Sequence, residues 1–289
     1  MAVTGLPRRQ RQRRLVGKAI MVYGTVAFFL ITTLLPFVWM AISSVKPNRE
    51  LYNLEQSPFA LHSLTFDHFT YLFGKYPFAR WMWNTFVVSV ISTAFSLVIG
   101  ILGGYSLARL RFRGAEAMGL GIFITYLVPR TLLFVPLVYV MKSFGLFDSI
   151  WSLVIVYPTF LIPFCTWLLM GYFRGIPREI EECAMIDGCS RMGALLKIVL
   201  PLCLPGIVSA GLFAFTLSWS EFIYALTFIQ SAANKTLSVG AVGGLTVGDT
   251  LFWGSLMAAA LLGSVPVALF YSFFLEYYVK GLTAGAVKG

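Results

Sequence analysis

The amino-acid sequence predicts an all-α integral membrane protein with six transmembrane helices and with both termini on the cytoplasmic side. Three observations predict it. Of 289 residues, 58% are hydrophobic and only 12% are charged, whereas soluble domains carry about 25% charged residues. Six windows are long and apolar enough to cross a bilayer. Positive charge also gathers in the segments that lie on one side of these windows.

Each predicted span is an apolar window of about 20 residues or more, the helical length that crosses a hydrocarbon core of about 30 Å. The windows are 19–43, 85–108, 117–141, 151–173, 205–229 and 252–279. They divide the chain into a basic tail (1–18), a first transmembrane helix (19–43), an external loop (44–84), a core of five helices (85–279) with an inner loop at 174–204, and a C-terminal tail (280–289). Because the number of spans is even, both tails lie on one side.

The N-terminal tail contains six basic residues and no acidic residue. Its charge is similar to that of a signal peptide. The apolar stretch that follows is longer than the apolar core of a signal peptide and lacks a small-residue cleavage site. We therefore expect an anchor that the mature protein keeps.

Lysine and arginine give the orientation, because cytoplasmic loops are enriched in them. The outer loops carry six: Lys46, Arg49, Lys75, Arg80, Lys142 and Lys235. The inner segments carry fifteen: Arg8, Arg9, Arg11, Arg13, Arg14, Lys18, Arg109, Arg111, Arg113, Arg174, Arg178, Arg191, Lys197, Lys280 and Lys288. The net charge of +10 thus follows membrane topology, and no basic face with interleaved aromatic residues indicates a nucleic-acid partner.

The inner loop 174–204 begins with the pattern of a short amphipathic helix. Pro177 is typical of a helix start, and Ile180, Cys183 and Ala184 lie at i, i+3 and i+4. We expect these three on one face and the acidic residues on the other. Gly188 fits a C-terminal cap in the left-handed conformation.

A second helix follows Gly188 in the same loop. Ser190 fits its N-cap, and its apolar residues are Met192, Leu195, Leu196 and Val199. Such a loop could lie on lipid as an interfacial helix. Because anionic inner-leaflet lipids disfavour an acidic helix, a protein groove is the better partner.

Within this loop, the pattern Glu-x-Ala-x-x-x-Gly followed after nine residues by Ile-x-Leu-Pro resembles the EAA loop of permease subunits of binding-protein-dependent ABC importers. The matching residues are Glu182, Ala184, Gly188, Ile198, Leu200 and Pro201. Cys183 stands where the family usually has alanine, and both side chains are small. The resemblance implies a type I ABC importer permease fold in which this loop is a cytoplasmic coupling helix that docks on an ATPase, with Glu182, Ala184, Asp187, Gly188, Ile198 and Pro201 as its docking residues.

The resemblance also implies the partners: a second homologous permease subunit, two cytoplasmic ATPase subunits, an extracytoplasmic sugar-binding protein and membrane lipid. The chain lacks a G-x-x-x-x-G-K motif. We therefore expect no cofactor and no enzymatic activity in this chain, with ATP and Mg²⁺ bound by the partner ATPases. The expected location is the bacterial cytoplasmic (inner) membrane, which the chain crosses several times.

Other segments are similar to the carbohydrate-importing, maltose-type branch of that family. They are GLTAGAVKG (281–289), LPFVWMAISSVKP (35–47), LTFDHF (64–69), GGYSLARLRFRG (103–114) and SWSEFIYAL (218–226). The substrate class implied is a sugar, an oligosaccharide or a polyol.

Four residues are candidates for the translocation path. Glu221 lies inside the fifth span and Arg130 inside the third, where charges are costly and usually face a cavity or a partner. Glu221 could instead be a structural carboxylate. Arg130 could pair with Glu221, meet a polar substrate or extend toward the membrane surface. Trp219 and Ser220 neighbour Glu221 in the SWSEF motif.

Two other classes of function remain as alternatives. A stand-alone secondary transporter of a small polar solute usually shows inverted repeats and intramembrane ion-coupling groups, and here only Glu221 could carry a proton. A membrane-embedded enzyme would need a catalytic triad, a metal-ligand set or paired carboxylates. We expect no metal site, and we expect the four cysteines to be small apolar fillers.

Overall fold

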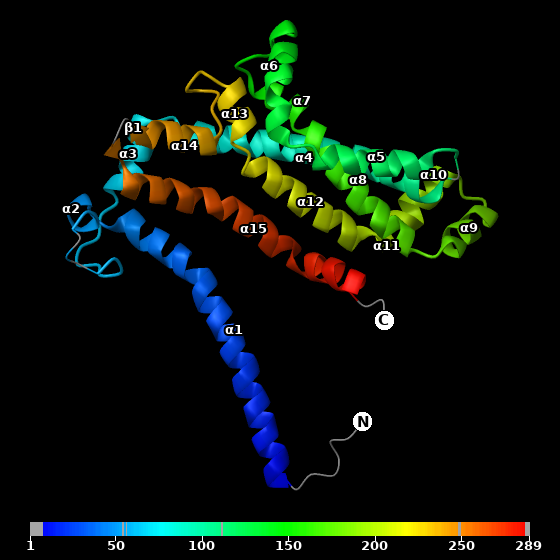
Figure 1. Ribbon diagram of the computed structural model, residues 1–289, viewed down its shortest axis with the longest axis horizontal. Coiled ribbons are helices and arrows are strands. Elements are labelled where there is room, and N and C mark those ends of the chain that lie inside the picture. Colours follow the sequence, from blue (N-terminus) through cyan, green and yellow to red (C-terminus); the bar gives the residue numbers. More distant parts are fainter. Residues whose placement is uncertain (1–7, 54, 56, 111, 248–249, 287–289) are drawn as a thin grey trace. The chain divides into compact units, whose positions relative to one another are not determined.

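The computed structural model describes residues 8–53, 55, 57–110, 112–247 and 250–286, and these are mostly helical (Figure 1). The chain divides into two compact units. The first comprises Met1–Leu72 and Leu251–Leu262, and the second comprises Phe73–Thr250 and Gly263–Gly289.

The first unit is built around the long helix α1 (Arg8–Val45), followed by the short helix α2 (Asn48–Leu51). It also holds most of α3 (Asp67–Lys75) and the first turns of α15 (Trp253–Ala286). The apolar part of α1, Gly17–Val45, contains an 18-residue window in which no residue is buried inside the protein. Such a helix is stable only where lipid or another subunit covers its apolar side chains.

The second unit contains the remaining helices. They are α4 (Phe78–Arg109), α5 (Ala115–Leu127), η1 (Arg130–Leu132), α6 (Phe134–Ser143), α7 (Ile150–Val156), α8 (Pro158–Gly175), α9 (Arg178–Ile186), α10 (Arg191–Ala194), the π-helix η2 (Leu195–Val199), α11 (Leu200–Leu202), α12 (Leu204–Trp219), α13 (Ile223–Phe228) and α14 (Leu237–Leu245). A two-residue strand pair, β1 (Thr246–Val247) and β2 (Thr250–Leu251), precedes α15.

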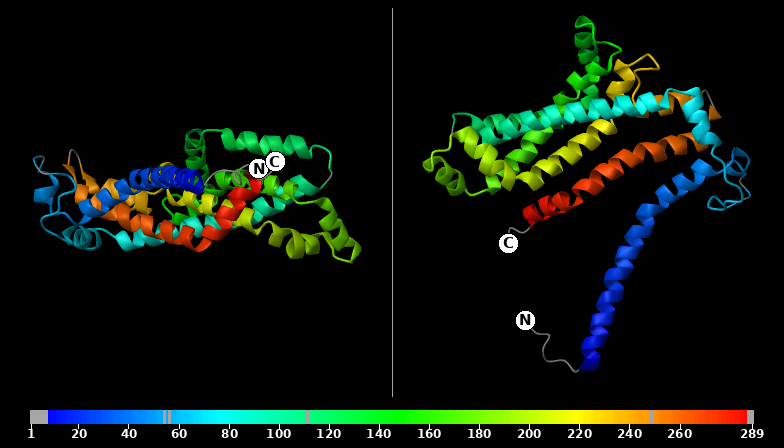
Figure 2. Two further views of the ribbon diagram at one scale, coloured as in Figure 1. Left: turned by 90° about the horizontal axis from the view of Figure 1, so that it is seen from below. Right: turned by 180° about the vertical axis from the view of Figure 1, so that it is seen from behind.

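The centre of the second unit is the packing of α4 against α8 and of α12 against both (Figures 1 and 2). Glycines on α4 allow the close approach. A Cβ atom at Gly100 would lie 2.6 Å from the Cβ of Cys165, and one at Gly104 would lie 3.0 Å from the backbone nitrogen of Met170. Small residues of this spacing let membrane helices pack backbone to backbone, here within one subunit.

Four predicted spans are confirmed as long apolar helices within the described part of the chain: Gly17–Val45, Phe78–Arg109, Ile150–Gly175, which is α7 and α8 joined at Tyr157, and Trp253–Tyr277. A fifth crossing exists if the bent pair Arg191–Leu202 and Leu204–Trp219, which meet at 78°, is taken as one span. The count of six is therefore not reached by continuous helices.

The third predicted window, 117–141, is wrong as a single helix, because the chain breaks at Val128 and Pro129. Both residues have extended ψ angles, 126° and 121°. A proline ring disfavours the helical conformation of the residue before it, so α5 ends at Leu127. After η1 the chain forms α6, in which Pro136 lies in the first turn, where a missing N–H is tolerated.

The fifth window, 205–229, is also interrupted. Helix α12 ends at Trp219, Ser220 and Phe222 have non-helical backbone angles, and α13 begins at Ile223. Glu221 therefore lies at a break between two helices, whereas the sequence pattern predicted a position inside one.

Candidate functional site

The loop 176–203 contains the residues that the sequence predicted as a docking element. Its first helix, α9, ends as predicted at Gly188, whose φ is +90°. The Gly188 amide donates to the Met185 carbonyl at 3.1 Å, and the Cys189 amide donates to the Ala184 carbonyl at 3.0 Å. This pair of bonds is a Schellman motif, and glycine adopts its positive φ without strain.

The second half of the loop follows the predicted Ser190 cap. The Ser190 hydroxyl accepts a hydrogen bond from the Gly193 amide at 3.1 Å. Leu195 and Val199 are buried in an apolar cluster with Tyr105 and Phe173. Met192 and Leu196 are exposed, so only half of the predicted apolar stripe packs against the protein.

The orientation of α9 differs from the expected one. Of the three residues expected on one face, Ala184 is buried, but Ile180 is 40% exposed and Cys183 is exposed. The other buried residue is Glu181, at 5% exposure. Ile186, at the end of α9, is 84% exposed. The helix thus turns a carboxylate inward and several apolar side chains outward.

The inward position of Glu181 has a physical cause in α4. Its Oε1 accepts a hydrogen bond from the Tyr105 hydroxyl, and its Oε2 lies 3.5 Å from the Arg109 Nε. Arg109 also donates from Nη2 to the Ile176 carbonyl at 2.8 Å. A charged group is buried at acceptable cost only when it is paired and hydrogen-bonded in this way.

Beside this ion pair lies a pocket of about 420 Å³. Its charged lining residues are Arg109, Arg178, Arg191, Glu181 and Glu182. Arg178 reaches from α9 back to α4, where its Nη2 donates to the Ala108 carbonyl at 3.3 Å. Both α9 and α4 therefore contribute charged side chains to their junction.

The predicted docking residues divide into two groups. Glu182, Asp187, Gly188 and Pro201 are exposed, whereas Ala184 is buried and Ile198 is half-buried. The sequence reasoning missed Tyr105, Arg109, Glu181 and Ile186. For Arg109, the one available signal was a lone charge in the last turn of an apolar helix.

Of the path candidates, Glu221 is bonded inside the protein. Its Oε2 accepts hydrogen bonds from the Tyr157 hydroxyl at 2.9 Å and from the Ala225 amide at 3.0 Å. Its Oε1 accepts one from the Tyr224 amide at 2.9 Å. The carboxylate thus caps the N-terminus of α13, where free N–H groups favour negative charge.

Arg130 and Glu221 do not form the predicted ion pair in the described structure. The Arg130 guanidinium lies over the Phe160 ring, 4.7 Å from its centroid, and the Arg130 carbonyl accepts a hydrogen bond from the Tyr224 hydroxyl at 3.0 Å. The two residues thus contact different parts of Tyr224. The cation is stabilised by an aromatic face.

The last two candidates flank the same break. Trp219 is buried, and its Nε1 donates to the Gly263 carbonyl at 3.1 Å. Ser220 is exposed, and its hydroxyl donates to the Thr216 carbonyl at 2.8 Å. Only Ser220 of this pair presents its side chain at the surface.

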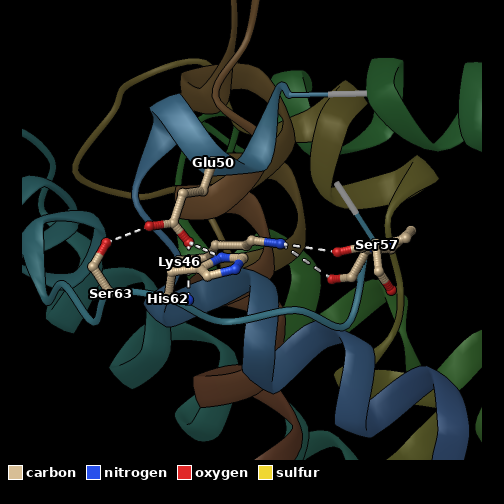
Figure 3. Close-up of polar contacts among 6 residues, drawn as sticks. Lys46, Glu50, Ser57, His62 and Ser63 are labelled. Carbon is tan, nitrogen blue, oxygen red and sulfur yellow. Dashed lines mark hydrogen bonds and ion pairs between the residues drawn. The ribbon is translucent and has the colours of Figure 1, made fainter. Parts of the chain in front are cut away.

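A separate polar cluster in the first unit contains Lys46, Glu50, Ser57, His62 and Ser63 (Figure 3). Buried Glu50 accepts hydrogen bonds from the Ser63 hydroxyl and, at 3.2 Å, from the His62 amide. Buried Lys46 directs its Nζ toward the carbonyls of Ser57 and Pro58, at 3.5 and 3.4 Å. The hydrogen bond from Ser63 is the main cause that lowers the pKa of Glu50 below its usual range. The charges of Lys46 and Glu50 thus both have nearby partners. These contacts hold Ser57, His62 and Ser63 close to the start of α2.

Residues 96–284, well over half of the chain, match the family described as "Binding-protein-dependent transport system inner membrane component". The chain belongs to this family of ABC transporter permeases. Helices α8 to α12, including the whole loop 176–203, lie inside the matched region.

Individual relatives extend the match to most of the chain. It is 37% identical to the sulfoquinovosyl glycerol transport system permease protein SmoH of Agrobacterium fabrum, covering 91% of this chain and 92% of that protein. It is 36% identical to the inner membrane ABC transporter permease protein YcjP of Escherichia coli, covering 92% and 95%. It is 31% identical to the diacetylchitobiose uptake system permease protein DasC of Streptomyces coelicolor, covering 92% and 95%.

A solved structure shares the fold at lower identity. It belongs to a bacterial ABC transporter involved in the import of the acidic polysaccharide alginate. The TM-score is 0.74 at 20% identity, covering 94% of this chain and 99% of that chain.

Proposed function

We propose that the chain is the transmembrane permease subunit of an ATP-driven importer that moves a carbohydrate into the cytoplasm. The observation that carries this proposal is the loop 176–203, hereafter the docking loop. It presents a glycine-capped helix whose apolar end, Ile186, is exposed to a partner. The carbohydrate class is supported by relatives named for sulfoquinovosyl glycerol and diacetylchitobiose transport.

In this proposal the chain crosses a bacterial inner membrane six times, with both termini in the cytoplasm. The third crossing consists of α5 and α6, joined by the break at Pro129, and the fifth consists of α12 and α13, joined by the break at Glu221. Interrupted helices are tolerated in membranes where protein or water satisfies the freed backbone groups. The excess of basic residues in the proposed cytoplasmic segments supports the orientation.

The proposed assembly contains a second, homologous permease, two ATPase subunits on the cytoplasmic side, an external sugar-binding protein and surrounding lipid. ATP and Mg²⁺ would be bound by the ATPases. The exposed docking residues Glu182, Asp187, Gly188 and Pro201 would contact an ATPase, while Ala184 and Ile198 would hold the docking loop against its own subunit. An exposed apolar patch beside polar residues is typical of a protein interface.

Within the translocation path, we assign different roles to the four candidates. Ser220 and half-exposed Arg130 would face the path, where Arg130 can donate to the oxygens of a sugar. Glu221 and Trp219 would hold the break between α12 and α13 in shape, because their polar atoms are already bonded to the protein.

Reconstitution in proteoliposomes tests the function. The chain alone should neither bind ATP nor take up sugar, whereas the complex with its genomic-neighbour ATPase, second permease and binding protein should take up sugar in an ATP-dependent manner. Uptake by the chain alone, driven by a proton gradient, would favour the secondary-transporter alternative.

A further inference from the structure

We propose that Glu181 is a positioning residue that, with Tyr105 and Arg109, joins the docking loop to α4, so that ATP-driven movement of the loop is passed to the transmembrane helices. This inference rests on the proposed function, because it assigns a role to residues beside the ATPase-docking surface. It concerns side chains that face away from that surface.

Helix α9 has almost no apolar anchor on its own subunit. Ala184 is its one buried apolar residue, and Ile180 and Ile186 are exposed. The second half of the docking loop differs, because Leu195 and Val199 are fully buried there. Apolar packing therefore holds the second half, and α9 must be held by polar contacts.

Polar contacts bridge α9 and α4 in both directions. The Glu181 carboxylate reaches from α9 to the Tyr105 hydroxyl and to Arg109, whose Nε lies 3.5 Å away. Arg178 reaches from the first turn of α9 to the Ala108 carbonyl at 3.3 Å. Arg109 reaches from α4 to the Ile176 carbonyl at 2.8 Å, just before α9.

The ion pair between Arg109 and Glu181 is shielded from water. The side chains of Arg109 and Glu181 are only 3% and 6% exposed. Two opposite charges removed from water separate only at a large cost, since each would be left buried without its partner. A salt bridge on the surface would be a flexible contact. The buried position makes this one a stiff joint.

Helix α4 is packed so that it passes a movement of its end on to its neighbours. Gly100 and Gly104, which lie within about one and a half turns of Tyr105, bring the backbone of α4 against Cys165 and Met170 of α8. Helix α12 packs against α4 and α8. A displacement of the end of α4 cannot be absorbed by this close packing, so it moves the three helices together.

The experiment uses the full complex in proteoliposomes and measures sugar molecules transported per ATP hydrolysed. The variants are Tyr105→Phe, which removes one hydroxyl, and Glu181→Gln, which removes one charge. Matched controls are Tyr126→Phe on α5, whose ring packs against Phe164, and Glu116→Gln, an exposed carboxylate at the start of α5. Co-purified ATPase is measured for every variant.

We expect both variants to retain the ATPase as the wild type does and to transport about tenfold less sugar per ATP, the factor that corresponds to one lost hydrogen bond to a charged group. The controls should transport as the wild type does. If Tyr105→Phe and Glu181→Gln transported as much sugar per ATP as the controls, the inference would be overturned and the proposed function would stand. If Glu181→Gln fails to assemble, Tyr105→Phe decides alone. Failure of the wild type to retain the ATPase would overturn the proposed function and this inference with it.

Discussion

The Tyr157 hydroxyl donates a hydrogen bond to the Glu221 carboxylate at 2.9 Å, which ties α13 to the junction of α7 and α8. Both side chains are buried, and the same carboxylate caps α13. Both oxygens of the buried Glu221 carboxylate therefore accept hydrogen bonds.

From this contact we predict that Tyr157→Phe destabilises the protein by about 2 kcal/mol, because a buried carboxylate loses a donor. The measurement is the thermal-unfolding midpoint of the purified protein in detergent. Tyr126→Phe is the control and should change the midpoint little. Equal midpoints for the two variants would show that the hydroxyl of Tyr157 contributes nothing.

A second prediction concerns Arg130 and Glu221 together. Because Arg130 lies over Phe160 and Glu221 caps α13, each charge has its own partner. Arg130→Gln and Glu221→Gln should therefore have additive effects on stability, within about 0.5 kcal/mol. A double variant more stable than Glu221→Gln alone would instead show that the two charges compensate each other, as the sequence suggested.

Sequence reasoning succeeded where the cause of a structure is local. Gly188 and Ser190 were recognised as caps because the backbone geometry at a helix end depends on a few neighbouring residues. Four spans were found because their apolar length exceeds the thickness of a bilayer.

It failed where the cause lies far away in the chain. Periodicity placed the acidic residues of α9 on one outer face, but Glu181 points inward because Tyr105 and Arg109 are there to receive it. Hydropathy alone does not show the breaks at Pro129 and Glu221, because both windows remain apolar across them. Pro129 is itself a local signal for the first break, whereas the break at Glu221 arises where a carboxylate caps the free N–H groups of α13.

A third prediction tests the docking role of Gly188. A Cβ atom added there meets no atom within 4 Å, so within this chain the main effect of Gly188→Leu is the φ of +90°, a strain of about 1–2 kcal/mol. Gly114, at φ +91° and also in open space, provides a matched control. Both leucine variants should insert in the membrane with similar stability, and only Gly188→Leu should lose ATPase co-purification. Retention of the ATPase by both variants would place the docking surface elsewhere.

A fourth prediction concerns the exposed end of α9. Ile186→Ala should leave the stability of the chain within about 0.5 kcal/mol of the wild type, since the side chain contacts solvent. It should raise the Kd for the ATPase about tenfold, because burying an isoleucine contributes roughly 1.5–3 kcal/mol. Ile124→Ala, an exposed isoleucine on α5, is the control. Titration of labelled ATPase into the reconstituted permease measures the Kd of Ile186→Ala and of Ile124→Ala. Equal Kd values would exclude Ile186 from the interface.

The last prediction concerns Asp148 in the turn before α7. Its Oδ1 accepts hydrogen bonds from the amides of Gln230 and Ser231, at 2.8 and 2.9 Å. Burial raises the pKa of Asp148, but the hydrogen bonds from Ser231 and Gln230 outweigh burial and hold this pKa below its usual range. The ionised carboxylate therefore stabilises the segment 229–234.

Because the folded-state pKa is lowered, this stabilisation is complete above the unfolded value of about 3.9 and is lost as the pH falls through the folded value. The protection of the Gln230 and Ser231 amides against hydrogen exchange, relative to their intrinsic rates, should thus be high at pH 6 and fall at pH 3. Asp148→Asn should show reduced protection at both pH values, because asparagine tolerates the φ of +60° at this position but carries no charge. A wild type whose protection does not change between the two pH values would show that the Asp148 charge does not hold this segment.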